Sequence, residues 1–331
     1  MNPATALSYT PSGGWEAPQG LNLFVQKAAL SPHNGGVVAV ARRGSKNAAE
    51  QDELFWGSWN KGGGFSSFTK VGNVGFAVGG PALTSIGVAV ELVFLGQDFK
   101  HYTAQLGEFG VWSPFGAFPG GKAGEQAFGP SGAGLSSRGV EAWGAHAGEN
   151  KALYISSKAG PGSSWGFSTA VPSSPLVNTI LPVVRAFEGG VTVAYVLEKN
   201  GRIALNMLQT PQNVWLGEAT VGSNAVTGSD FDFLRLGADD YLVVWCSLDN
   251  TEIYYARGGA GSWSAPAVVL SPGQPTSSPV VLPGVGGKIA EVLFTAGGSL
   301  RHARYNGTDF EVSEVVATSN AISVSATLLM P

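Results

Sequence analysis

The chain repeats one short unit along almost its whole length. In the clearest copy, at residues 250–266, a strand-like stretch at 253–257 is followed by a glycine-rich turn and then by Trp263. Alternating side chains are typical of a strand, and the glycines supply the positive-φ positions that a tight hairpin needs. The unit therefore predicts a β-hairpin, and the spacing of its copies decides the fold class.

Copies of this unit recur at a nearly constant spacing. Each copy opens with an aliphatic or aromatic residue, called the anchor here, and successive anchors lie 47, 45, 54, 50, 50 and 47 residues apart. The anchors are Leu7, Leu54, Phe99, Leu153, Ile203, Ile253 and Leu300. A polar or glycine-rich turn and then an aromatic residue follow each anchor, in order Trp15, Phe65, Trp112, Trp165, Trp215, Trp263 and Phe310. A period of about 40 to 50 residues made of short strands is typical of a β-propeller, in which each period is a four-stranded blade.

We therefore predict an all-β fold, a single β-propeller domain over residues 1–331 with seven blades of about 48 residues. Residues 3–18 hold only the second half of a unit, six full blades occupy about 25–317, and 321–330 has the pattern of a closing strand. Pairing of the N- and C-terminal strands in one blade would close the ring and remove exposed sheet edges, which promote aggregation. A six-bladed ring with frayed ends is the alternative geometry.

The composition restricts the possible partners. Only 13% of residues are charged and the formal net charge is −4, so no basic stripe exists to neutralise phosphates. We expect neither a nucleic-acid partner nor attraction to an anionic membrane surface. Four scattered histidines do not predict a metal cluster, and no phosphate-cradling loop is present, so we expect no metal and no cofactor. Cys246 is the only cysteine, and its apolar neighbours favour a buried structural thiol.

The first residues, 1–5, contain neither the basic nor the apolar segment of a secretory signal. No apolar run reaches the roughly 18 residues that a bilayer span requires. The sequence thus predicts a soluble chain without membrane insertion, either cytoplasmic or released by a non-classical route. A homo-oligomer is compatible with these observations.

Groups suited to catalysis are hard to find in the sequence. Asp230 with Asp232, and Asp239 with Asp240, come nearest to the two facing carboxylates of a glycosidase, but each pair lies in a turn or on a solvated face. The arginines that a sialidase would gather are spread over several units, and the tryptophan turns lack the acid of an Asp box. We therefore expect no enzyme. A sialidase-like glycosidase that uses Asp232 or Glu141 is the less favoured alternative.

The repeated aromatic residues have two interpretations. As core residues they would pack one blade against the next, and the protein would be a protein-interaction scaffold. As site residues they would line grooves between blades. There an aromatic face could stack on the C–H face of a sugar while a nearby polar side chain binds its hydroxyls.

Several units share the form Asn-x-(Leu/Ile)-Tyr, a glycine turn and Trp-Ser. This pattern is carried by residues 149–154 with Trp165, 249–254 with Trp263 and Ser264, 298–302, and 99–102 with Trp112 and Ser113. In these residues the chain resembles the seven-bladed bacterial β-propeller lectins of the Photorhabdus type and their bangle-lectin-like repeat family. The resemblance implies a multivalent, non-catalytic carbohydrate-binding protein with sites in clefts between blades and fucosylated or O-methylated glycans as partners.

Matched by position, the resemblance implies eight sugar-binding residues. They are His101, Tyr102, Trp112, Tyr154, Trp165, Tyr255, Trp263 and His302. The unit at 203–206 has neither the tyrosine nor the histidine, so we expect it to have lost its site.

Overall fold

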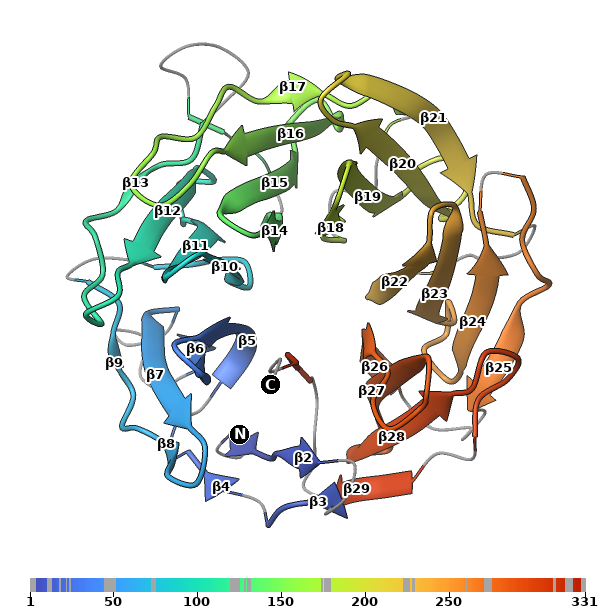
Figure 1. The fold of residues 1–331 in the computed structure, drawn as a ribbon, viewed down its shortest axis with the longest axis horizontal. Helices are drawn as coiled ribbons and strands as arrows, with labels where there is room; N and C mark the ends of the chain where they lie inside the picture. The colour runs from blue at the N-terminus through green and yellow to red at the C-terminus, as the bar shows by residue number, and fades with distance from the viewer. Residues whose placement is uncertain are drawn as a thin grey trace.

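Figure 1 shows β-sheets arranged as a ring around a central axis, each with its first strand innermost. The structure is a computed structural model. It describes residues 4–10, 14–17, 19–21, 23, 25–44, 52–72, 76–119, 126–127, 129, 132–173, 175, 180–222, 227, 230–259, 261–270, 276–311, 314–318 and 324–328. Within these residues, no helix is long and apolar enough to cross a bilayer.

Six antiparallel sheets follow one another along the chain. The first three blades are β5 (Val25–His33), β6 (Gly36–Arg43), β7 (Leu54–Asn60), β8 (Gly64–Phe65) and β9 (Thr69–Lys70); β10 (Ala82–Ile86), β11 (Ala89–Leu95), β12 (His101–Leu106) and β13 (Gly116–Ala117); and β14 (Gly134–Arg138), β15 (Glu141–Ala147), β16 (Leu153–Lys158) and β17 (Thr169–Ala170). The last three are β18 (Val183–Phe187), β19 (Gly190–Val196), β20 (Ile203–Gln209) and β21 (Val214–Thr220); β22 (Phe231–Gly237), β23 (Asp240–Cys246), β24 (Ile253–Gly258) and β25 (Ala267–Leu270); and β26 (Thr276–Pro283), β27 (Ala290–Ala296), β28 (Ser299–Tyr305) and β29 (Glu314–Thr318).

Local sequence explains both the strands and the turns. The middle strands β11, β19 and β27 are buried at every position, because each blade is sandwiched between its neighbours. The hydrophobic clusters accordingly span adjacent blades, as where Val38 of the first blade packs in one cluster with Leu92 of the second. The turn between β5 and β6 has φ of 48° at Asn34 and 72° at Gly35. Two positive φ values in succession are what a tight hairpin requires, and Asn-Gly adopts them readily.

The predicted all-β propeller is confirmed. In the described residues six blades are complete and extend from Val25 to Thr318, and the chain ends do not form the seventh four-stranded sheet that would make a seven-bladed ring. The N-terminal segment contributes only four two-residue strands. They are β1 (Thr5–Ala6), β2 (Tyr9–Thr10), β3 (Gly14–Trp15) and β4 (Gln19–Gly20), with β1 paired to β4 and β2 to β3. Such short ladders cannot make a four-stranded sheet by themselves.

Both chain ends lie between the sixth and the first blade (Figure 1). Of the expected closing strand, 321–323 and 329–330 lie outside the described residues. Within 324–328 no strand forms, and among the described residues no ladder joins this segment to β1–β4. Instead, the Ser325 hydroxyl donates to the carbonyl of Ala28 in β5, at 2.6 Å. The C-terminal segment therefore contacts the inner strand of the first blade.

Strand register corrects the anchor in the second blade. Leu153 opens β16 and pairs with Ala147, the last residue of the strand before it. In the second blade this position belongs to His101, which pairs with Leu95. Phe99 lies two residues earlier, exposed in the turn, with φ of 60°. A bulky residue rarely adopts a positive φ, so a phenylalanine is not expected in this turn from local sequence.

The anchor of the N-terminal segment also shifts. The Leu21 amide donates to the Ala4 carbonyl at 2.9 Å, in the same way that the Val171 amide donates to the Leu153 carbonyl at 2.8 Å. Ala4, rather than Leu7, therefore occupies the anchor position. The N-terminal strands thus have the register of the two outer strands of a blade.

Candidate binding site at the edge of the sixth blade

One contact recurs around the ring. The aromatic residue that precedes the fourth strand of a blade packs against the third strand of the blade before it. Ring centroids are 6.0 Å apart in Trp56–Trp112, 4.9 Å in Tyr255–Phe310 and 5.3 Å in His302–Trp15. An aromatic ring therefore walls each of these grooves between blades, and the polar residues nearby determine what else the groove can hold.

The groove between the sixth blade and the N-terminal strands, called the open groove here, is centred on His302 of β28. The imidazole is buried, with Nδ1 2.9 Å from Glu314 Oε1 and Nε2 2.5 Å from Glu291 Oε2. The rings of Tyr9 and Trp15 pack against it, with centroids 5.2 and 5.3 Å away. Both ring nitrogens are engaged, so His302 positions the two carboxylates.

Glu314, the first residue of β29, is held by three donors. Its Oε1 accepts from His302, from Arg304 Nη2 at 3.1 Å and from Trp15 Nε1 at 3.3 Å. These bonds, above all the one from His302, hold the pKa of Glu314 below its usual value. Because all three reach one oxygen, Oε2 has no donor among the described residues, and the side chain is 44% exposed. Glu314 is therefore a fixed, ionised acceptor at the mouth of the groove.

Arg304 supplies a cation beside this acceptor. Burial alone would lower the pKa of Arg304, but the hydrogen bond to Glu314 and the nearby carboxylates raise it. The guanidinium lies over the Tyr9 ring, with Cζ 5.8 Å from the ring centroid. Arg304 and Glu314, together with His302 and Glu311, line a pocket of about 100 Å³. The pocket thus combines an acceptor and a donor, and the rings of Tyr9 and Trp15 contact the residues that line it.

The groove between the second and third blades contains the same buried acid. Glu91 in β11 pairs with Gln105 in β12, and Glu291 in β27 pairs with Arg304 in β28. Strand register makes the two glutamates equivalent. Both are buried, so each must find partners within the protein.

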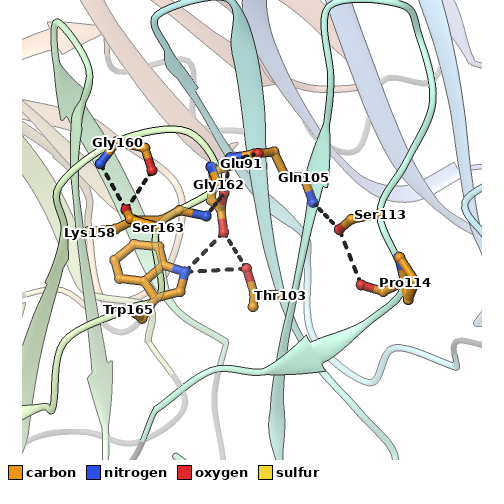
Figure 2. Close-up of polar contacts among 10 residues, drawn as sticks. All are labelled: Glu91, Thr103, Gln105, Ser113, Pro114, Lys158, Gly160, Gly162, Ser163 and Trp165. Atoms are coloured by element: carbon orange, nitrogen blue, oxygen red, sulfur yellow. Dashed lines mark hydrogen bonds and ion pairs between the residues drawn. The ribbon is translucent and has the colours of Figure 1, made fainter.

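Figure 2 shows how Glu91 is satisfied. Its Oε1 accepts from Trp165 Nε1 at 2.9 Å and from the Thr103 hydroxyl at 2.5 Å. Its Oε2 accepts from Lys158 Nζ at 2.8 Å and from Gln105 Nε2 at 3.3 Å. The ion pair is dry, with side chains 7% exposed for Lys158 and 1% for Glu91. Protein groups occupy both oxygens, and we call this the closed groove.

The residue that the following strands contribute differs between the two grooves. Lys158 forms a bridge to Trp165, and the equivalent residue in the N-terminal segment is Tyr9, which pairs with Trp15. In the closed groove the lysine of the following blade therefore neutralises the buried acid and fills the space beside it. In the open groove the tyrosine carries no ammonium, and the buried acid is satisfied by His302 from its own blade.

Two further grooves are apolar. Trp215 packs against a cluster that includes Ile155, between the third and fourth blades. Trp263 packs against a cluster that includes Leu205, between the fourth and fifth blades. These tryptophans stabilise the ring by burying apolar surface, in agreement with the core interpretation.

Between the fifth and sixth blades the charged groups form ion pairs and hydrogen bonds with other protein groups. Arg257 binds Asp240 through Nε at 3.0 Å and Nη2 at 2.7 Å, and its Nη1 donates to the Gly307 carbonyl at 2.8 Å. The Tyr255 hydroxyl donates to Asp309 Oδ1 at 3.0 Å, and burial together with this bond raises the pKa of Tyr255 to about 12. This groove therefore offers a ligand fewer free groups than the open groove.

The eight residues implied by the sequence are distributed around the ring. Only His302 lies in the open groove, while Trp112, Trp165, Trp263 and Tyr255 lie in four other grooves.

The remaining three lie at the other end of the third strands. Tyr102 stacks on Phe94 and Tyr154 on His146, with centroids 5.6 and 5.5 Å apart. His101 is fully buried, 5.1 Å from the His146 ring. The structure thus separates these three from the open pocket.

Sequence reasoning missed Arg304, Glu314 and the pairing of Trp15 with His302. A signal existed for Arg304, because it alternates with His302 on one strand and so shares its face. Trp15 was recognised as a unit aromatic, but its neighbour depends on how the ring closes.

The acids considered for catalysis have structural contacts. Asp232 accepts from Arg185 Nη2 at 2.6 Å and from the backbone amides of Phe233 at 2.8 Å and Val281 at 2.9 Å. Burial raises the pKa of Asp232, and the charge of Arg185 and the backbone amides oppose this. Because Arg185, Asp232 and Val281 belong to three successive blades, this carboxylate links the fourth, fifth and sixth blades.

Glu141 forms a surface ion pair with Arg138, at 3.0 Å. Over the described part of the chain, no three His, Cys, Asp or Glu side chains are grouped so as to hold a metal ion.

Comparisons with known proteins show a likeness of fold. No protein-family model matches the sequence, and no curated protein shows significant similarity to it. Among solved structures, the Aleuria aurantia lectin in complex with alpha-methyl-L-fucoside is 18% identical, with a TM-score of 0.54 over 89% of this chain and 96% of that one. The SapL1 lectin in complex with alpha methyl fucoside is 14% identical, with a TM-score of 0.57 over 90% and 98%. A polysaccharide lyase, the PL25 ulvan lyase, is 10% identical, with a TM-score of 0.62 over 94% and 89%.

These likenesses confirm the predicted similarity to β-propeller lectins at the level of the fold. The same architecture also occurs in an enzyme, so the fold alone does not decide between binding and catalysis. The finer assignment to lectins of the Photorhabdus type stays a prediction.

Proposed function

We propose that the protein is a non-catalytic carbohydrate-binding protein and that the open groove is its sugar site. The observation that carries this proposal is a pocket lined by Glu314 and Arg304, with the Trp15 indole hydrogen-bonded to Glu314 at its edge. A fixed carboxylate and a guanidinium can exchange hydrogen bonds with neighbouring hydroxyls, while an aromatic ring covers the C–H face of a sugar. Two proteins with the same fold bind fucosides, which makes methyl α-L-fucoside the first ligand to test.

The chemistry of the pocket favours binding over catalysis. A glycosidase needs a carboxylic acid that is protonated near neutral pH, and the pKa of Glu314 is shifted in the opposite direction. A lyase needs a base that reaches the substrate, and both nitrogens of His302 are held by carboxylates. We therefore propose recognition without turnover.

A glycan-array screen, followed by competition with the free monosaccharide, tests this proposal. We expect a competable hit whose binding falls about 10-fold or more in Glu314→Gln and in Trp15→Ala, because each loses contacts in the pocket. Glu198→Gln, which alters an exposed ion pair between Glu198 of the fourth blade and Lys151 of the third, is the matched control and should bind normally. A blank array, or binding that is unaffected by both pocket variants, would contradict the proposal.

We further propose that the two chain ends form an incomplete seventh blade, so that residues 1–331 make one domain. The register of Ala4 and Tyr9, which matches the outer strands of a blade, supports this arrangement. The contact of Ser325 with β5 supports a place for the C-terminal segment on the inner side.

A further inference from the structure

The open groove combines a fixed acceptor with an accessible donor, and in the described residues the five grooves between successive blades lack this combination. The acceptor is Glu314, which stands opposite His302 in the fourth strand of the sixth blade. The equivalent positions in the first five blades are Thr69, Gly116, Thr169, Ala219 and Ala267. None of these five residues carries a charge, so an acidic acceptor occupies this register position only in the sixth blade. In the N-terminal segment the equivalent residue is Gln19, whose side chain is bonded to the backbone of Phe65.

We propose that the protein has one open glycan site per chain, in place of the several equivalent sites that the repeated sequence implies. This inference rests on the proposed function and specifies the valency of that same site. Its ligand would be one neutral sugar unit with adjacent hydroxyls, bound across Glu314 and Arg304 and covered by Trp15.

The closed groove is the nearest copy of this site, and two features exclude a ligand from it. Lys158 reaches in from the third blade and binds the buried Glu91 at 2.8 Å. Displacing the lysine would leave Glu91 as an unpaired buried charge, which is strongly unfavourable. In addition, Gly116 stands where the open groove has Glu314, so this groove also lacks the acceptor.

The four remaining grooves between successive blades lack the features of the open groove for simpler reasons. In those of Trp215 and Trp263 the indole rings pack against apolar clusters, which offer a sugar no charged partner. The one between the fifth and sixth blades has a guanidinium, but Arg257 is chelated by Asp240 and bound to a backbone carbonyl. In the first groove Trp56 and Trp112 pack edge to face, and Thr69 stands opposite Trp56.

Calorimetry on the full-length wild-type protein gives the stoichiometry directly, with methyl α-L-fucoside or the best monosaccharide from the array as titrant. We expect one equivalent per chain. In a parallel NMR titration the indole N–H signal of Trp15 should shift, while that of Trp165 should not, because its N–H is bonded to Glu91. Neither measurement depends on a variant that could fail to fold.

The two proposals fail in distinguishable ways. Two or more equivalents per chain, or binding that survives Glu314→Gln at wild-type affinity, would overturn the single-site inference while a sugar-binding function stands. One equivalent that shifts Trp165 instead of Trp15 would overturn it as well. Absence of binding for every array glycan would overturn the proposed function and the inference together.

Discussion

The choice of partner for a buried acid distinguishes one groove from another. Glu91 and Glu291 occupy equivalent positions, but the first is neutralised by Lys158 from the next blade and the second is bonded by His302 from its own. A carboxylate removed from water needs such a partner, since its lost hydration is otherwise uncompensated. The residue that the adjacent blade contributes therefore helps to decide whether the groove can accept a ligand.

Removal of the lysine should destabilise the protein. In Lys158→Met the charge of Glu91 stays buried without its counter-ion, and we expect a loss of about 3–5 kcal/mol in the free energy of unfolding. Urea denaturation measures this loss. Lys151→Met, which breaks an exposed ion pair with Glu198, should cost at most about 1 kcal/mol. Equal effects of the two substitutions would show that the Glu91 pair contributes no more than a surface contact.

The buried imidazole of His146 should make stability dependent on pH. Burial, with a smaller contribution from His101, lowers the pKa of His146 to about 3 from the 6.5 of an unfolded chain. Between these values the unfolded state binds the extra proton, so stability decreases as pH falls from 6.5 toward 3. The expected slope is at most about 1.4 kcal/mol per pH unit from this residue.

Unfolding measurements between pH 7 and 5 on wild type and His146→Phe isolate this contribution. The variant removes the titrating group, so its stability should fall less steeply with decreasing pH. The pKa of His33 is also lowered by burial, and its contribution is the same in both proteins and cancels in the difference. Parallel pH curves would refute the assignment.

At the scale of strands and blades, the sequence predicted how often the units repeat better than where each one begins. The spacing of the unit aromatics located six blades, because one aromatic per period packs each blade on its neighbour. It misplaced Phe99, since a phenylalanine at φ of 60° is disfavoured and alternation alone does not show it. It also misplaced Leu7, because a segment with only two-residue strands has too few alternating positions to fix its register.

The candidate site was predictable only where it depends on a single strand. His302 was found from its place in the unit, and Arg304 could have been, because both lie on one face of β28. Trp15 belongs to the same site only because the N-terminal strands lie beside the sixth blade, and local sequence does not contain that contact. Glu314 can be recognised as a site residue only when its contacts with Trp15 and His302 are known, and these contacts come from the folded structure.

Asp232 connects blades, and its loss should weaken the ring without affecting sugar recognition. In Asp232→Ala, Arg185 loses its partner and the amides of Phe233 and Val281 lose an acceptor, so we expect a cost of about 2–4 kcal/mol. Thermal unfolding measures this cost, and calorimetry at a permissive temperature should give unchanged glycan affinity. If the wild type instead hydrolysed an aryl glycoside and the variant did not, Asp232 would be catalytic and our assignment wrong.

For the whole molecule, the N-terminal strands should matter for both binding and solution behaviour. Deletion of residues 1–24 removes Trp15 and Tyr9 and uncovers the side of the sixth blade that they pack against. We expect loss of glycan binding together with self-association, because uncovered sheet surfaces pair with other chains. Light scattering coupled to size exclusion detects the second effect.

Trp15→Ala is the matched control for this deletion, because it removes the ring but keeps the strands. It should bind weakly and remain as dispersed as the wild type. A truncated protein that stays dispersed and binds normally would show that the first 24 residues belong neither to the ring nor to the site.

The hydrogen bond between Trp15 and Glu314 joins residues 299 positions apart in the sequence. During synthesis the tryptophan leaves the ribosome first, and its partner follows only when the last blade has been translated. We therefore expect nascent chains and prematurely terminated products to be inactive, however well their early blades have folded. Recognition would be acquired only after the sixth blade has been translated and has folded against the N-terminal strands.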